Sequence, residues 1–177
     1  PQGLAAWHFR ATQEAAPAGR SMRFLVLPPE KVVLRGDAIV AISPDGEKLA
    51  FGGIEPDGKT RLWVRPLSSL TAEPVPGSEG VVSVFWSPDS RYLASTHTDH
   101  TVQIWDLFGK TPVKTYHGHT DSVRGVAWSP NGAVIATASN DRTARIWEAA
   151  TGKHIYTYHG HTDWVTSVTW SNDGTRI

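Results

Sequence analysis

Histidine, hydroxyl and carboxylate side chains recur together in this sequence, which is the combination that a nucleophilic catalytic triad needs. The chain contains His119, Thr137 and Asp141, and Ser95 and Asp99 precede the last two by 42 residues. A triad requires a base within hydrogen-bond reach of a hydroxyl and a third group that orients the base. A set that recurs once per repeat, without a strained nucleophile turn, is instead typical of a hydrogen-bonded network that fixes local geometry. The pattern therefore predicts no catalytic residues and no enzymatic activity.

Two His-Gly-His sequences, at 117–119 and 159–161, place pairs of imidazoles two residues apart. Positions i and i+2 share one face of a strand, so two such pairs could in principle bind a metal ion. No acidic residue is spaced to complete the ligand set, and the absence of cysteine excludes thiolate zinc and iron-sulfur sites. We predict neither a metal site nor a cofactor.

Charge and hydropathy argue against two classes of partner. Lys and Arg number 17 and Asp and Glu number 17, so the formal net charge is zero. The arginines Arg124, Arg142 and Arg145 form a cluster too small for the phosphate contacts that dominate nucleic-acid binding. No stretch approaches the roughly 18 consecutive apolar residues of a spanning helix. We expect no nucleic-acid partner and no direct membrane contact within this segment.

The tryptophans reveal an internal repeat of 42 residues. One series consists of Trp63, Trp105 and Trp147, and a second of Trp86, Trp128 and Trp170. Turn tetrapeptides follow at nearly the same spacing and begin at Ser43, Ser87, Ser129 and Ser171. A fixed period of this length indicates a repeat architecture.

Each repeat is predicted to form four short strands. In the third repeat they span 122–128, 134–139, 143–147 and 154–158, which are rich in Val, Ile, Thr and Trp. The Ser-Pro turns have residue types that a type I turn prefers. The spacing of Val123, Val126 and Trp128 breaks strict alternation, which predicts a β-bulge at the strand entrance. Four antiparallel strands every 42 residues match the blade period of a β-propeller, so we predict an all-β fold.

The third repeat resembles the WD-repeat family, most clearly in Gly118-His119, Asp141 and Ile146-Trp147, and the resemblance covers residues 79–177. It implies a buried, hydrogen-bonded structural tetrad that consists of His119, Thr137, Asp141 and Trp147. The preceding repeat has Ser95, Asp99 and Trp105 at the matching positions. Gly77 stands at its histidine position, so its tetrad is expected to be incomplete.

The first repeat departs from this pattern, because Gly53 stands at the hydroxyl position and two extra residues separate the turn from Trp63. Residues 22–95 are similar to TolB-type propellers and to extracytoplasmic propeller regions that follow bacterial membrane-anchored Ser/Thr kinases. Residues 1–21 are expected to form a disordered linker. The propeller segment is then 22–177, with repeats at about 37–76, 79–118 and 121–160 and a partial repeat at 163–177.

The loops at one rim of the blades are the expected partner surface, which is the usual one in this family. Trp164 aligns with Ser122 and Gly80, off the 42-residue lattice of tryptophans, so blade packing does not require it. It is a candidate contact residue, with packing against a neighbouring blade as the alternative. The rim candidates are Asp121, Ser122, Arg124, Asn140, Arg142, Asp163, Trp164 and Thr166, with Thr98 and His100 as further ones.

These features predict a non-catalytic propeller segment that binds a protein or peptide, as a scaffold or sensor module of a larger bacterial-type protein. The alternative is a regulatory or ligand-sensing propeller appended to an enzyme, such as a membrane-anchored Ser/Thr kinase or a peptidase. The compartment, cytoplasmic or extracytoplasmic, depends on sequence upstream of Pro1.

Counting strands predicts about three and a half blades, with a candidate strand at Met22 to Leu27 before the three full repeats. A closed propeller uses about four to eight blades. We therefore expect the missing blades to be supplied in cis or by a second copy, and the isolated segment to self-associate through its open ends.

Overall fold

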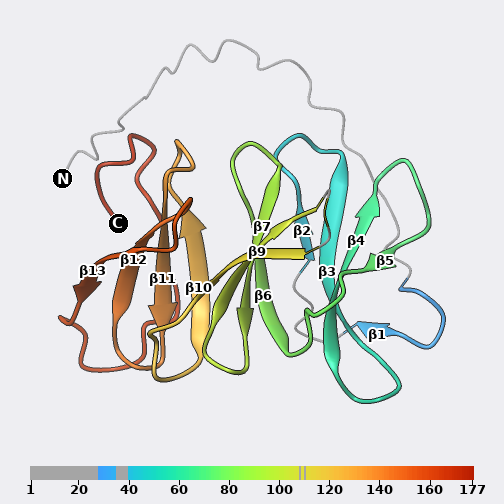
Figure 1. Ribbon diagram of the computed structural model, residues 1–177, viewed down its shortest axis with the longest axis horizontal. Helices are drawn as coiled ribbons and strands as arrows, with labels where there is room; N and C mark the ends of the chain where they lie inside the picture. The colour runs from blue at the N-terminus through green and yellow to red at the C-terminus, as the bar shows by residue number, and fades with distance from the viewer. Residues whose placement is uncertain (1–27, 35–39, 108, 110) are drawn as a thin grey trace, which may run out of the picture.

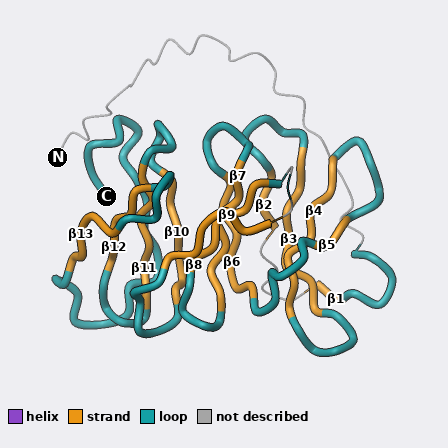
Figure 2. The backbone as a smooth tube through the Cα atoms, viewed as in Figure 1, coloured by secondary structure: helices purple, strands orange, loops and turns teal. Residues whose placement is uncertain are grey.

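The structure is a computed structural model, and it describes residues 28–34, 40–107, 109 and 111–177. These residues form one five-stranded and two four-stranded antiparallel sheets, which lie side by side in chain order (Figures 1 and 2). The prediction of an all-β partial propeller is confirmed. The described part of the chain contains no helix that could cross a membrane. The predicted linker and the candidate strand at Met22 to Leu27 lie outside the described residues.

Each sheet is one blade, and its strands follow one another along the chain. Blade 1 contains β1 (Val33–Leu34), β2 (Val40–Ile42), β3 (Lys48–Ile54), β4 (Thr60–Pro66) and β5 (Glu73–Pro74). Blade 2 contains β6 (Val81–Trp86), β7 (Tyr92–His97), β8 (Val102–Asp106) and β9 (Thr111–Tyr116). Blade 3 contains β10 (Val123–Trp128), β11 (Val134–Ser139), β12 (Ala144–Glu148) and β13 (His154–Tyr158).

The turn between the first two strands of blade 3 illustrates how the local sequence fixes the chain path. The N–H of Gly132 donates to the carbonyl of Ser129 at 2.8 Å, and Gly132 has a φ of 70°, which glycine adopts at little cost. The Ser129 hydroxyl donates to the Asn131 side chain at 2.7 Å. The predicted bulge is confirmed, since the pairing register shifts between Val123 and Gly125 and, in blade 2, between Val81 and Ser83.

Blade 1 differs from the others in its first strand and in its interior. Both β1 and β2 pair with β3, so the blade begins upstream of the predicted boundary at residue 37. A Cβ atom on Gly53 would lie 2.5 Å from Val32 Cγ1 and 3.1 Å from Trp63 Nε1. Trp63 packs directly over this glycine, and its buried Nε1 has no hydrogen-bond partner. No side-chain hydroxyl fits at this position, which explains why blade 1 lacks the polar network of the later blades.

The second tryptophan series joins neighbouring blades. In each case the indole Nε1–H donates to a backbone carbonyl in the preceding blade, in the strand that leads into the turn at Ser43, Ser87 or Ser129. The bonds are Trp86 to Ala41 at 3.0 Å, Trp128 to Phe85 at 3.4 Å and Trp170 to Ala127 at 3.0 Å. Residues 159–177 contain no assigned strand, but the Trp170 bond and a bond from Val165 N to Ser139 O at 3.0 Å hold this segment against blade 3.

Candidate functional site

A buried polar network in blade 3 links the loop before β10, strand β11, the turn after it and strand β12. The His119 ring lies between two partners, with Nδ1 2.8 Å from Asp141 Oδ2 and Nε2 2.7 Å from Thr137 Oγ1. Trp147 Nε1 donates to the same Thr137 oxygen at 2.9 Å. The structure therefore brings together all four residues of the tetrad that the sequence predicts.

The two end groups of this network, the Trp147 indole and the Asp141 carboxylate, determine which atom donates in each hydrogen bond between them. The Trp147 indole can only donate, and an ionised Asp141 carboxylate can only accept. Thr137 therefore accepts from Trp147 and donates its own proton to His119 Nε2, while His119 Nδ1–H donates to Asp141. A neutral imidazole with its proton on Nδ1 satisfies every group, which suits an interior site.

The electrostatics of the network agree with a neutral imidazole. Burial lowers the pKa of His119, although the hydrogen bond to Asp141 acts in the opposite direction. Burial also raises the pKa of Asp141, but hydrogen bonds from Thr143, His119 and the Thr120 backbone outweigh it and lower that pKa to about 2. A neutral imidazole therefore lies beside an ionised carboxylate.

The network has the composition of a catalytic triad but lacks access for a substrate. The Thr137 side chain has no exposed surface, and its oxygen is already hydrogen bonded to both Trp147 and His119. A nucleophile must approach a reacting atom at about 3 Å, which this enclosed hydroxyl cannot do without rearrangement of the blade.

Blade 2 builds the same relay with an imidazole from a different element. Trp105 Nε1 donates to Ser95 Oγ at 2.7 Å, and Ser95 Oγ lies 2.7 Å from His97 Nε2. His97 Nδ1 lies 3.1 Å from the backbone carbonyl of Glu79, which takes the role that a carboxylate has in blade 3. Asp99 accepts instead from the Thr101 N–H and hydroxyl.

Alignment of blade 2 with the third repeat does not identify His97, because the position that aligns with His119 is Gly77, in the preceding loop. The signal was nevertheless present in the sequence. Residues 95 and 97 are two apart in one strand, so their side chains share a face and His97 can reach the Ser95 hydroxyl. The Ser95 hydroxyl, for which the repeat pattern predicts no imidazole partner, therefore bonds His97.

The two buried imidazoles predict that acid destabilises the fold. Burial holds the pKa values of His97 and His119 below their ordinary value of 6.5, so the unfolded chain binds protons at higher pH than the folded chain does. Their contribution is complete above about pH 7 and is lost as the pH falls through 6.5 and then through the lower folded values. We expect the melting temperature to fall between pH 7.5 and pH 5.5. We expect the His97→Gln variant to have a lower melting temperature than the parent at pH 7.5 but a shallower dependence of that temperature on pH. A parent melting temperature that stays constant or rises on acidification would contradict the prediction.

The rim candidates occupy the end of the blades at which β10 begins and β11 ends. Trp164 is 60 % exposed, and the Arg124 guanidinium lies 6.0 Å from its ring centroid. Arg124 Nε donates to Asn140 Oδ1 at 3.0 Å, and Asn140 is buried. These three residues come together although Trp164 belongs to the repeat segment after that of Arg124 and Asn140. Arg142, Asp163 and Thr166 are exposed, and Asp121 and Ser122 are half-buried.

One turn position at this rim has a left-handed backbone in all three blades. Gly58 has a φ of 79°, His100 of 68° and Arg142 of 67°, and these residues lie 42 positions apart. Glycine adopts this conformation readily, whereas a residue with a side chain adopts it at a cost of about 1 kcal/mol. Blades 2 and 3 therefore retain a side chain at a position where glycine is the relaxed choice.

One family model and several known proteins match parts of this chain. The family model described as "WD domain, G-beta repeat" matches residues 65–106, 110–148 and 152–177. WD repeat-containing protein 1 of Xenopus tropicalis is 37% identical over 87 residues, which cover 46% of this chain and 14% of that protein. Protein HIR1 of Kluyveromyces lactis is 33% identical over 91 residues, covering 40% and 10% of the two chains. Protein HIRA of Dictyostelium discoideum is 36% identical over 97 residues, covering 46% and 8%.

The matched region spans only a small part of each of these longer relatives. The family model does not match residues before 65, so the resemblance of the first repeat to TolB-type propellers stays a prediction, as does a bacterial context. The matched segments cover more than half of the chain and contain five of the six repeated tryptophans and the blade 3 network. The chain belongs to the WD-repeat family.

Proposed function

We propose that this chain is a non-catalytic interaction module of a larger protein and binds a protein or peptide at the rim formed by Arg124, Asn140, Arg142 and Trp164. The observation that supports this most is the contrast between two groups of side chains. The histidine networks are enclosed, whereas Trp164, Arg124 and Arg142 lie exposed, on a loop, on β10 and on a turn respectively. Tryptophan and arginine are enriched among the residues that dominate binding energy at protein interfaces.

The rim is also partly ordered before any partner arrives. Asn140 holds the Arg124 guanidinium, which in turn lies over the Trp164 ring. Side chains that are already fixed lose less conformational entropy on binding.

Replacing Trp164 by alanine tests the proposal. The variant should bind a partner captured by the parent chain about 30-fold more weakly, which corresponds to about 2 kcal/mol, because truncation removes the central aromatic contact. Its melting temperature should match the parent value, since the side chain is mostly exposed. Leu70→Ala is the matched control, because Leu70 is 80 % exposed and lies in blade 1. The proposal fails if Trp164→Ala keeps the parent affinity or loses affinity only because it unfolds.

We propose further that the face of blade 3 that carries Ile155, Tyr156 and Tyr158 is covered by another blade, in cis or from a second copy. Tyr116 of blade 2 is buried, stacks on Trp147 with ring centroids 5.5 Å apart, and donates to Ala149 O at 3.0 Å. Tyr158 occupies the same position one repeat later, yet it is 45 % exposed, together with Ile155 and Tyr156. Contiguous apolar surface of this kind favours association.

The isolated 177-residue chain should therefore self-associate, which light scattering measures as a mass above that of one chain. Replacing both Ile155 and Tyr156 by lysine should lower the measured mass, because the new charges oppose burial of this face. A compact parent monomer with cooperative melting would contradict this part of the proposal.

A further inference from the structure

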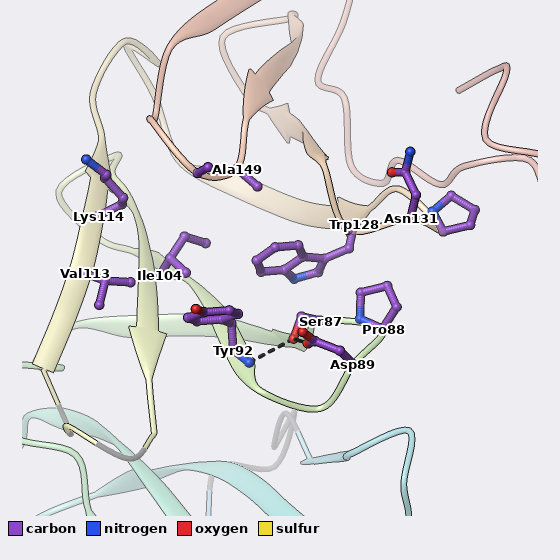
Figure 3. Close-up of a pocket in the computed structure, with 13 residues that line it drawn as sticks. Ser87, Pro88, Asp89, Tyr92, Ile104, Val113, Lys114, Trp128, Asn131 and Ala149 are labelled. Carbon is purple, nitrogen blue, oxygen red and sulfur yellow. Dashed lines mark hydrogen bonds between the residues drawn. The ribbon is translucent and has the colours of Figure 1, made fainter.

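A cavity of about 620 Å³ lies between blades 2 and 3, at the opposite end of the strands from the rim (Figure 3). Its walls come from the Ser-Pro turns of both blades, from β9 and from the chain that follows β12. Figure 3 shows the Trp128 indole and the Tyr92 ring facing this space, with Val113 and Lys114 on a neighbouring strand. Ile104 and Ala149 add to the apolar lining, and Asp89 and Asn131 supply polar atoms.

The matching junction between blades 1 and 2 is largely filled. Its cavity is only about 200 Å³, and Leu107 lines it and packs against the buried cluster that contains Val75 and Trp86. Ala149 stands 42 residues after Leu107, so blade 3 has a methyl group where blade 2 has a leucine side chain. The larger cavity therefore coincides with a smaller residue at this position.

A second sequence difference between the two junctions concerns the hydrogen bond that connects adjacent turns. In blade 2 the Ser90 hydroxyl accepts a hydrogen bond from Asp45 N of blade 1 at 2.9 Å, which ties the adjacent turns together. The residue 42 positions later is Gly132, which has no side chain to form such a bond. The chain thus contains one closed and one open version of the same junction.

We propose that the open junction binds a leucine- or phenylalanine-sized apolar side chain of a partner peptide, as a second site apart from the rim. Leu107 provides the precedent, because a leucine side chain already packs at the equivalent place in the closed junction. The volume lies within the range of about 300–1,000 Å³ that is usual for ligand pockets, so it accommodates the side chain with flanking backbone. Asp89, Asn131 and Lys114 are placed to pair with the peptide groups of that backbone.

Saturation-transfer NMR on the full 177-residue chain tests this site with capped amino acids as probes. N-acetyl-leucinamide and N-acetyl-phenylalaninamide should receive saturation, and N-acetyl-glycinamide, which has the same backbone and no side chain, should receive little. The readout improves with protein size, so self-association does not obscure it. Trp164→Ala should behave as the parent does, which separates this site from the rim.

The double variant Ala149→Leu with Gly132→Ser imports the closed junction into the open one. Serine is compatible with the Gly132 backbone, because Ser90 has a φ of 60° and Gly132 of 70°. The variant should weaken binding of both apolar probes by about tenfold or more, since the added leucine occupies their place. Ala133→Leu is the control, because it adds the same side chain at an exposed position that does not line the cavity.

If the double variant proves less stable than the parent, Val113→Asp replaces it, because Val113 is 45 % exposed and its substitution leaves the interior intact. A charge in this wall should likewise remove binding of the apolar probes. Equal saturation of the glycinamide and leucinamide probes would overturn the proposal. So would undiminished binding of the apolar probes by a folded double variant or by Val113→Asp.

Discussion

Replacing Thr137 by valine should lower the free energy of unfolding by about 3 kcal/mol, although the two side chains have nearly the same shape. The hydroxyl is the central member of the blade 3 network, where it accepts from Trp147 and bonds His119. Valine leaves both an indole N–H and an imidazole nitrogen buried without a partner, and each such group costs about 1–3 kcal/mol. Urea denaturation followed by tryptophan fluorescence measures the loss.

Thr115→Val provides the control, since Thr115 is an exposed residue of β9 with a side chain outside any such network. Its stability should stay within about 0.5 kcal/mol of the parent, as is usual for surface substitutions. Ser95→Ala in blade 2 should lose a similar amount to Thr137→Val, because Ser95 bonds Trp105 and His97 in the same way. A loss below about 1 kcal/mol for Thr137→Val would mean that the network contributes little to stability.

Asp141→Ala should cost about 1–3 kcal/mol, and Asp99→Ala should cost clearly less. The two carboxylates occupy equivalent positions in consecutive repeats but have different partners. Asp141 accepts from His119 and the Thr120 N–H as well as from Thr143, so its removal leaves an imidazole N–H buried and unpaired. Asp99 has only its turn contacts to Thr101 among the hydrogen bonds of the described residues.

Paired denaturation curves of the two alanine variants measure this difference. The comparison has an internal control, because both substitutions remove the same side chain from the same type of turn. Equal losses would show that the carboxylate stabilises the turn itself and not the imidazole. Asp141 has a pKa of about 2 and therefore stays ionised over the range in which the histidines titrate. A change in stability over that range then comes from the imidazoles and not from this carboxylate, so the pH dependence distinguishes the same alternatives.

Much of the fold follows from spacing, because each blade repeats the same local pattern of strands and turns. The 42-residue tryptophan series predicts the blades, and the spacing of Val123, Val126 and Trp128 predicts the bulge. The repeat pattern does not identify His97, for a physical reason: a buried hydroxyl needs an imidazole nearby, but that imidazole can come from any element that reaches it. The side chain lies on the correct face of β7, so strand alternation contained the missing information.

The arrangement of residues between blades is harder to predict from sequence. Trp164 stands out because it lies off the tryptophan lattice, but its contact with Arg124 depends on how two repeat segments sit against each other. The open junction likewise depends on the pairing of Ala149 and Gly132 with walls from blade 2. Periodicity locates these residues along the chain, and only the packing of adjacent sheets shows what they face.

The central claim is that the buried networks stabilise the blades while the rim binds the partner. The most direct test is the dissociation constant of one captured partner for the parent, Thr137→Val and Trp164→Ala proteins, each measured on the folded fraction. We predict that Thr137→Val binds within about twofold of the parent and that Trp164→Ala binds about 30-fold more weakly. Loss of binding by folded Thr137→Val, with parent affinity in Trp164→Ala, would contradict the account and place the functional site in the network.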